Sequence, residues 1–60
     1  MKTKIKHLRE QKQLSQKELA KLAGVSYGTV QRAEYLGDIT INSLIKLAAA
    51  LEMPPAYFLS

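Results

Sequence analysis

The chain has 60 residues and a hydrophobic share of 47%, which suits one small packed domain and is too apolar for a disordered tail. It has no cysteine for a disulfide or thiolate metal site, and no run near the ~18 apolar residues of a membrane span. The net charge of +4 is uneven: residues 1–32 carry eight basic residues against two acidic ones (+6), and residues 33–60 carry one against three (−2). A basic half suits nucleic acid first, and an anionic membrane or an acidic protein next.

The first predicted element is a helix over Thr3–Gln13. Side chains at the helical spacing i, i+3, i+4 and i+7 form one stripe along the helix. This stripe consists of Ile5, Leu8, Arg9 and Lys12. Two interpretations of the other basic residues stay open: Lys2, Lys4 and Lys6 form an arm that follows a DNA groove, or they belong to a mobile tail. His7 has no partner at a metal-binding or catalytic spacing and is interpreted as a surface residue.

The second predicted helix covers Gln16 to Ala23. Ser15 followed by Glu18 is the capping-box pattern, in which each side chain bonds the backbone N–H of the other residue. The inward residues of this helix are Leu19, Ala20 and Ala23. Gly24 ends it, because glycine adopts the left-handed backbone conformation without a Cβ penalty.

A third predicted helix begins within three residues and runs from Tyr27 to about Leu36. Ser26 caps its start by accepting a backbone hydrogen bond, and Gly37 stops it. Two short helices joined by so tight a turn are a candidate helix-turn-helix, with Val25 and Val30 in the angle between them.

The outer face of this third helix is polar and lacks a carboxylate. At about 100° per residue, Val30, Ala33 and Glu34 fall on the inward side. The opposite and flanking positions hold Tyr27, Gly28, Thr29, Gln31, Arg32 and Tyr35. Arginine can fork to guanine, glutamine can pair with adenine or bond a phosphate, and tyrosine and threonine can reach phosphates or a thymine methyl group. The pattern therefore favours double-stranded DNA as a partner.

The fourth predicted helix runs from Ile41 to Leu51 and is capped by Thr40. Its apolar stripe consists of Ile41, Leu44, Leu47, Ala48 and Leu51. Proline at positions 54 and 55 breaks the chain, after which Ala56–Leu59 makes one last turn that lays Phe58 and Leu59 on the core. The sequence thus predicts one all-α domain over residues 1–60, a compact bundle of four to five short helices.

These patterns resemble a known family at the level of residues. The stretch LSQKELAKLAGVS, together with SLIKLAAALEM farther along, is similar to the Xre-type helix-turn-helix domain of lambdoid phage repressors and Cro proteins. The resemblance implies a lambda-repressor-like fold and sequence-specific binding of double-stranded DNA by a transcriptional regulator, and favours a repressor. It also implies a cytoplasmic protein of bacterial or phage origin, associated with the nucleoid.

The resemblance assigns roles to single positions. It implies that Gln16 binds a backbone phosphate and buttresses the third helix, and that Ser26 lies near phosphate. The positions that meet base edges are Tyr27, Gly28 and Arg32, and the secondary base or phosphate positions are Thr29, Gln31 and Tyr35. Backbone N–H groups near Ile41 and Asn42 are implied to bind phosphate.

The family also has an arginine–glutamate pair that ties its first and third helices, and Arg9 and Glu34 match it. We interpret this pair as structural rather than as a DNA contact. The chain departs from the family where Ala33 replaces a large aliphatic residue, and we expect Leu36 to compensate for the lost packing. Leu36 also stands where the family has glycine, and the next loop is one residue shorter, which puts phosphate contacts from that loop in question.

Several of these residues have a second interpretation. Gly28 either lets a base pair approach the backbone or is a neutral substitution, and Tyr27 either contacts DNA or packs over Gln16 or Lys17. Lys17 and Lys21 either attract phosphate weakly or belong to a solvated face. We include Lys17 among the DNA-binding candidates.

Two classes of function remain. The first is a DNA-binding regulator whose two copies read an inverted-repeat operator, pairing weakly or only on DNA. The second is a protein-interaction module, antitoxin-like or coactivator-like, that uses the fourth helix and residues 54–58. We find no catalytic constellation and expect no enzyme activity, cofactor, metal, membrane or small-molecule ligand. The operator sequence, the effector and the completeness of the chain stay open.

Overall fold

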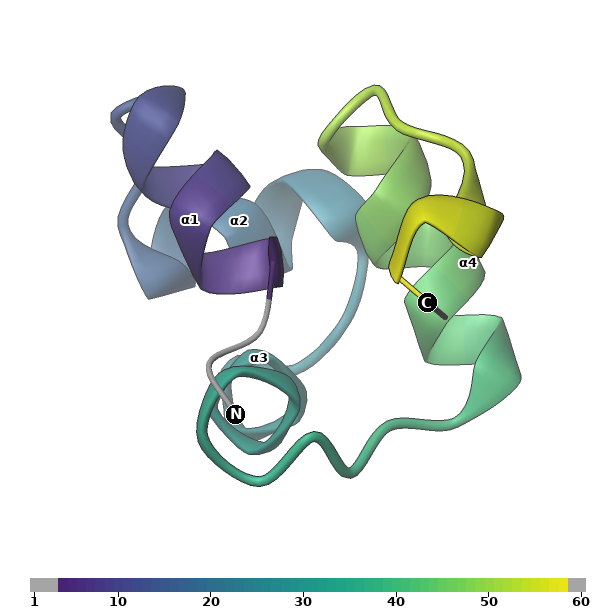
Figure 1. Ribbon diagram of the computed structural model, residues 1–60. Coiled ribbons are helices and arrows are strands. Elements are labelled where there is room, and N and C mark those ends of the chain that lie inside the picture. The colour runs from purple at the N-terminus through teal and green to yellow at the C-terminus, as the bar shows by residue number, and fades with distance from the viewer. Residues whose placement is uncertain (1–3, 59–60) are drawn as a thin grey trace.

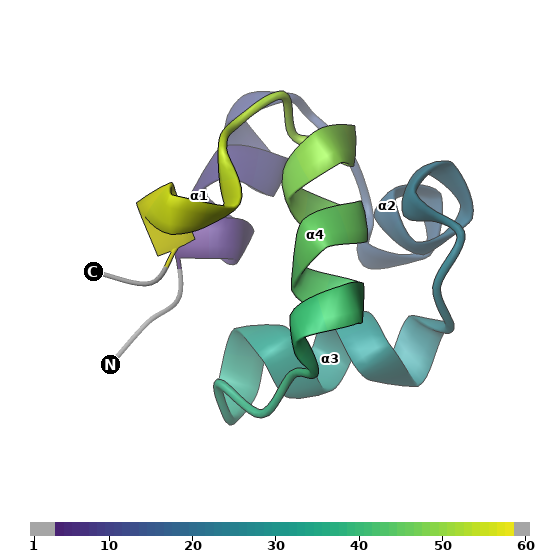
Figure 2. The same cartoon turned by 90° about the vertical axis from the view of Figure 1, so that its right-hand side faces the viewer.

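The computed structural model describes residues 4–58, which form four α-helices and one 3-10 turn, with no strand in this range. The elements are α1 (Lys4–Gln11), α2 (Gln16–Ala23), α3 (Tyr27–Tyr35), α4 (Ile41–Ala50) and η1 (Pro55–Phe58). Figures 1 and 2 show α3 at one end of the molecule, with α1, α2 and α4 gathered on one side of it. The all-α fold class predicted from the sequence is confirmed.

Hydroxyl side chains cap the N-termini of three helices at the residues that the sequence predicts. The Ser15 hydroxyl accepts from the Glu18 N–H at 3.0 Å, and the Glu18 carboxylate accepts from the Ser15 N–H at 2.8 Å, which completes the capping box. Ser26 accepts from the N–H three residues on at 3.1 Å, and Thr40 does the same at 3.2 Å. These bonds are local, so short sequence patterns suffice to predict them.

The ends of three helices differ from the predictions by one or two residues, whereas the second helix ends at Ala23 as predicted. The first helix ends at Gln11, because Gln13 takes a left-handed conformation (φ 59°) and the Leu14 N–H bonds back to the Arg9 carbonyl at 3.1 Å. The fourth ends at Ala50, before a similar reversal.

The left-handed residue that follows the fourth helix is Glu52 (φ 61°). The third helix ends at Tyr35, with Leu36 as its cap. Gln13 and Glu52 adopt a left-handed conformation that normally favours glycine. Because neither residue is glycine, the sequence carries no signal for these two helix ends. Thr3, the predicted start of the first helix, lies outside the described residues.

All four helices contribute to one core. The buried apolar residues are Ile5, Leu19, Ala20, Val30, Ala33, Leu44, Leu47, Ala48 and Leu51. Phe58 of η1 packs against this core as a half-buried residue, and Leu59 lies outside the described part of the chain. No helix within residues 4–58 combines the length and apolar character needed to cross a bilayer.

Two expectations about apolar side chains are wrong. Ile41 belongs to the predicted stripe of the fourth helix, yet 58% of it is exposed at the first residue of that helix. Leu36 does not compensate for Ala33, since Leu36 is 73% exposed while Ala33 is buried. The third helix has already ended at Leu36, so this side chain follows the departing chain and not the buried face.

Lys4 belongs to the first helix and not to an extended arm. Its Nζ donates to the Tyr57 carbonyl at 3.0 Å and lies 4.7 Å from the centre of the Tyr57 ring, a cation–π distance. These contacts join α1 to η1. The arm and mobile-tail interpretations are therefore both wrong for Lys4 and for Lys6, which also belongs to α1, and Lys2 lies outside the described residues.

Candidate nucleic-acid interface

The turn between α2 and α3 is closed by two hydrogen bonds onto one carbonyl. The N–H groups of Gly24 and Val25 both donate to the Ala20 carbonyl, at 2.9 and 3.0 Å. Gly24 has φ 74°, where a side chain would be strained, and Ala20 is buried. The two helices are thus held at a fixed angle before any side chain of α3 is considered.

The inner face of α3 is anchored through one buried carboxylate. Glu34 is 3% exposed and accepts from Arg9 Nε at 2.6 Å and from Arg9 Nη2 at 3.2 Å, a bidentate pair. Gln16 Nε2 donates to the same carboxylate at 3.0 Å. Arg9 Nη1 donates to the Leu14 carbonyl at 2.7 Å, so one guanidinium also holds the loop before α2.

This hydrogen-bond network connects α1, α2 and α3 near the C-terminal end of α3. The Glu34 carboxylate raises the pKa of Arg9 above its ordinary value, mainly through their hydrogen bond, and Arg9 stays charged. Burying two charges is unfavourable unless each is paired and hydrogen-bonded, and both conditions hold here. In the described residues no buried side-chain nitrogen or oxygen lacks a partner. The orientation of α3 therefore depends on Arg9, Glu34 and Gln16 together.

The outer face of α3 is open to solvent. Tyr27 is 41% exposed and Tyr35 is 67% exposed, and Gly28 and Arg32 are also exposed. Thr29 and Gln31 flank this face and are half-buried. The only carboxylate of the helix is the buried Glu34. A polyanion that approaches α3 from outside would meet aromatic, amide, hydroxyl and guanidinium groups.

Two local contacts shape the start of this face. Lys17 Nζ of α2 lies 5.6 Å from the centre of the Tyr27 ring, so the two helices meet through a cation–π contact. The hydroxyls of Ser26 and Thr29 lie 2.8 Å apart and share a hydrogen bond. Lys17 and Tyr27 therefore pack together, as one interpretation of the sequence expects, and both remain exposed.

Asn42 lies on a different element from the other candidates. It is exposed in the first turn of α4, and the N-terminal end of α4 is the end nearer to α3 (Figure 2). Thr40 caps this turn through the Ser43 N–H, while Asn42 has no part in the cap.

Part of the positive charge counted in the sequence is already used within the fold. Arg9 is paired with Glu34, and Lys12 Nζ lies 2.8 Å from Glu52 Oε1, a surface pair that the sequence pattern did not predict. The hydrogen bond from Lys12 lowers the pKa of Glu52. These partners lie 25 and 40 residues apart, beyond the reach of local patterns. The basic charge that residues 1–32 offer to a partner is therefore smaller than their net charge of +6 suggests.

Comparison with known proteins agrees with this geometry. A helix-turn-helix family model of the Xre/lambda repressor-like type matches residues 5–58, nearly the whole chain. A comparison with curated proteins gives no match. The chain belongs to the Xre/lambda repressor-like helix-turn-helix family. It is a DNA-binding protein of transcription regulation that recognises DNA sequence through its helix-turn-helix.

Proposed function

We propose that the protein is a transcriptional repressor that reads an inverted-repeat operator with α3 in the major groove and α2 across the backbone. Family membership supports the DNA-binding part of this proposal. The observation that carries the rest is the division of α3 into two faces. Its carboxylate is buried and neutralised by Arg9, while Arg32 and Tyr35 stand exposed on the opposite side and Tyr27 is exposed in the first turn. We place this activity on bacterial or phage DNA in the cytoplasm.

Base recognition is assigned to the exposed centre of α3. Arg32 has the donor geometry for guanine O6 and N7, and it is exposed in the helix. Gly28 faces open space: beyond its chain neighbours and the adjacent backbone of its own helix, no protein atom lies within 4 Å of the position a Cβ would occupy, so a base pair can approach its backbone. Tyr27 adds contact with a phosphate or a base edge beside them.

Phosphate contacts are assigned to the surrounding residues. Gln16 uses one amide N–H on Glu34, and a second donor on the same nitrogen remains for a phosphate oxygen. Lys17 and Asn42 are exposed on α2 and α4, where they can position the duplex. The other residues proposed to contribute base or phosphate contacts are Ser26, Thr29, Gln31 and Tyr35.

The dimensions of the chain suit one copy per half-site. The Cα atoms span 25 × 20 × 20 Å, and half-sites one helical turn apart are ~34 Å from centre to centre. With side chains added, two neighbouring copies would come into contact only at their edges. We therefore propose a dimer that forms on DNA.

The alternative function is a protein-interaction module. Exposed Ile41 and Ile45 on α4 favour it, because apolar side chains four residues apart form a continuous stripe. The C-terminal segment does not, since Phe58 packs on the core and the Tyr57 carbonyl is bonded to Lys4. A protein-interaction module would not require α3 to lack an exposed carboxylate, whereas DNA binding would. We therefore prefer DNA recognition.

Selection from a random pool of duplexes at about physiological salt, followed by sequencing of the bound fraction, tests the proposal. We expect an enriched inverted repeat whose half-sites lie about one turn apart. An enriched single half-site would retain sequence recognition and reject the dimer on DNA. Binding without enrichment that disappears as salt rises would reject the assigned base contacts and favour the interaction module.

A further inference from the structure

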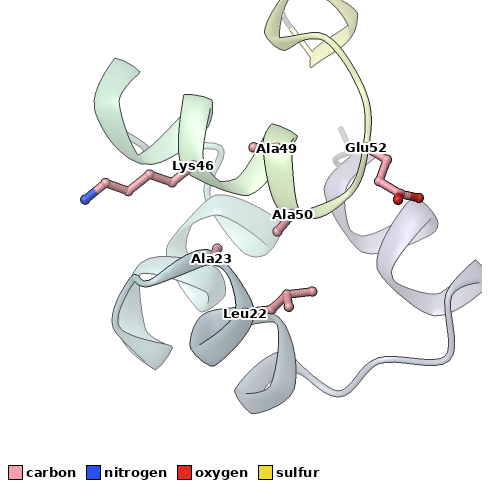
Figure 3. Close-up of a pocket in the computed structure, with 6 residues that line it drawn as sticks. All are labelled: Leu22, Ala23, Lys46, Ala49, Ala50 and Glu52. Carbon is pink, nitrogen blue, oxygen red and sulfur yellow. The ribbon is translucent and has the colours of Figure 1, made fainter.

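Three of the five acidic side chains are already engaged within the fold. Glu34 and Glu52 are paired with basic residues, and Glu18 belongs to the capping box of α2. Figure 3 shows the Glu52 side chain beyond the last turn of α4, on the side of α1. Glu10 and Asp38 are exposed, and within residues 4–58 their carboxylates accept no hydrogen bond and form no ion pair. These two carboxylates therefore leave their negative charge uncompensated in the described part of the chain.

Asp38 lies in the connection between α3 and α4, close to residues that we assign to DNA. Its N–H donates to the Arg32 carbonyl at 3.4 Å, which fastens its backbone to the last turn of α3. It comes three positions after Tyr35 and four before Asn42, so its Cα lies within about 11 Å of the first and about 15 Å of the second. Of the two uncompensated carboxylates, Asp38 is thus the one nearer in the chain to the proposed DNA contacts.

The two helix ends beside Asp38 act on its carboxylate in opposite directions. The C-terminal end of α3 carries partial negative charge and disfavours an acidic residue, whereas the N-terminal end of α4, capped by Thr40, carries partial positive charge and favours one. The two effects offset each other, so the carboxylate contributes little to the stability of the fold. It also stands just ahead of the first turn of α4, where a bound phosphate would meet its negative charge.

We propose that Asp38 weakens binding to the DNA backbone by repelling phosphate groups between α3 and the first turn of α4. The inference rests on the proposed function, because it requires α3 in the major groove and the start of α4 at the backbone. Attraction of phosphate supplies nearly all sequence-independent binding, so a carboxylate at this place lowers the affinity for every duplex. Stable binding then requires the base contacts of α3, and Asp38 thereby limits occupancy of DNA that lacks the operator.

Fluorescence anisotropy on a duplex of arbitrary sequence, at about 0.05 M and about 0.2 M salt, tests the proposal. We expect Asp38→Asn to bind about two- to tenfold more tightly than the wild type at the lower salt, and Asp38→Lys more tightly still. Both gains should shrink at the higher salt, because salt screens exposed charges.

Glu10→Gln is the matched control for Asp38→Asn. It removes the other exposed and unpaired carboxylate and changes the net charge equally, but it lies on α1, which carries no residue assigned to DNA. Its gain in affinity should therefore be smaller. Circular dichroism would verify that all three variants are folded.

Unchanged or weaker binding by Asp38→Asn would overturn the proposal, and weaker binding would make Asp38 a residue that supports a DNA contact. An equal gain in Glu10→Gln would also overturn it, since net charge alone would then explain the effect. The arbitrary duplex separates this test from that of the operator. If selection from the random pool enriches no sequence, recognition by α3 fails, while the comparison of the variants still decides the role of Asp38. Unchanged affinity in Asp38→Asn beside an enriched operator would reject this inference alone.

Discussion

The two faces of α3 differ in burial: the inner face is packed and hydrogen-bonded, and the outer face is exposed to solvent. On the inner face, Val30, Ala33 and Glu34 are each at most 3% exposed, and the carboxylate is held by Arg9 and Gln16. On the outer face, Arg32 and Tyr35 stand in solvent. From this comparison we propose that fold stability and DNA affinity depend on different residues of one nine-residue helix. Substitutions on each face should therefore change one property and spare the other.

Glu34→Ala is expected to have the largest effect, on stability. It leaves the Arg9 guanidinium largely buried without its charge partner, which costs about 3–5 kcal/mol, most of the stability of a domain this small. Urea denaturation followed by circular dichroism measures the loss. Glu52→Ala is the matched control, since it removes a carboxylate from the exposed pair with Lys12 and should change stability far less. Equal effects in the two variants would mean that the buried network does not orient α3.

Arg32→Ala should affect the other face alone. We expect a loss of about 1–3 kcal/mol in binding to the selected operator, with reduced discrimination at one base pair. The free energy of unfolding should stay within about 0.5 kcal/mol of the wild type, because the side chain is exposed. Fluorescence anisotropy on the operator and on single-base variants measures both affinity and discrimination. An equal loss on every duplex would make Arg32 a phosphate contact.

Gly28→Ala should move stability and affinity in opposite directions. Replacing glycine within a helix by alanine stabilises it by about 1 kcal/mol, and the new methyl group meets no protein atom within 4 Å outside its chain neighbours and the adjacent backbone of its own helix. Affinity for the operator should fall if a base pair approaches this backbone. Paired measurements of unfolding and DNA binding decide the matter: a variant that is more stable and binds equally well would identify Gly28 as a neutral substitution.

Lys17→Ala should weaken binding to every duplex by a similar, small factor. One lost phosphate contact flattens the dependence of log K on log salt by about 0.9 at most. The variant also removes the cation–π contact with Tyr27, so the salt titration should be repeated with Tyr27→Ala as a reference. An unchanged slope in Lys17→Ala would place this lysine outside the interface.

The smallest expected effect is a pH dependence of the α2 capping box. The backbone hydrogen bond from Ser15 lowers the pKa of Glu18 in the folded state, so the unfolded chain binds this proton more readily. The contribution of Glu18 is therefore present above about pH 4.3, the ordinary value of the side chain, and is lost as pH falls through the lower folded value. Glu18→Gln keeps a capping oxygen without titrating, so its stability should decline less with acid than that of the wild type.

The sequence alone determined the starts of α2, α3 and α4 and the side of α3 that faces outward. Ser15, Ser26 and Thr40 cap their helices as predicted, because a cap is decided within four residues. The 3.6-residue period likewise placed Glu34 inward and Arg32 outward. The resemblance, carried by the α2 and turn residues, led to the family that the comparison then confirmed.

Only the tertiary structure decided which side chains meet. Gln16 reaches Glu34 across 18 positions of sequence, and Lys4 reaches Tyr57 across 53. Ile41 shares the period of the α4 core stripe but has no neighbour to cover it. Periodicity gives the direction of a side chain around its own helix axis, whereas burial requires another element in that direction. Where that element lies depends on the packing of all four helices together.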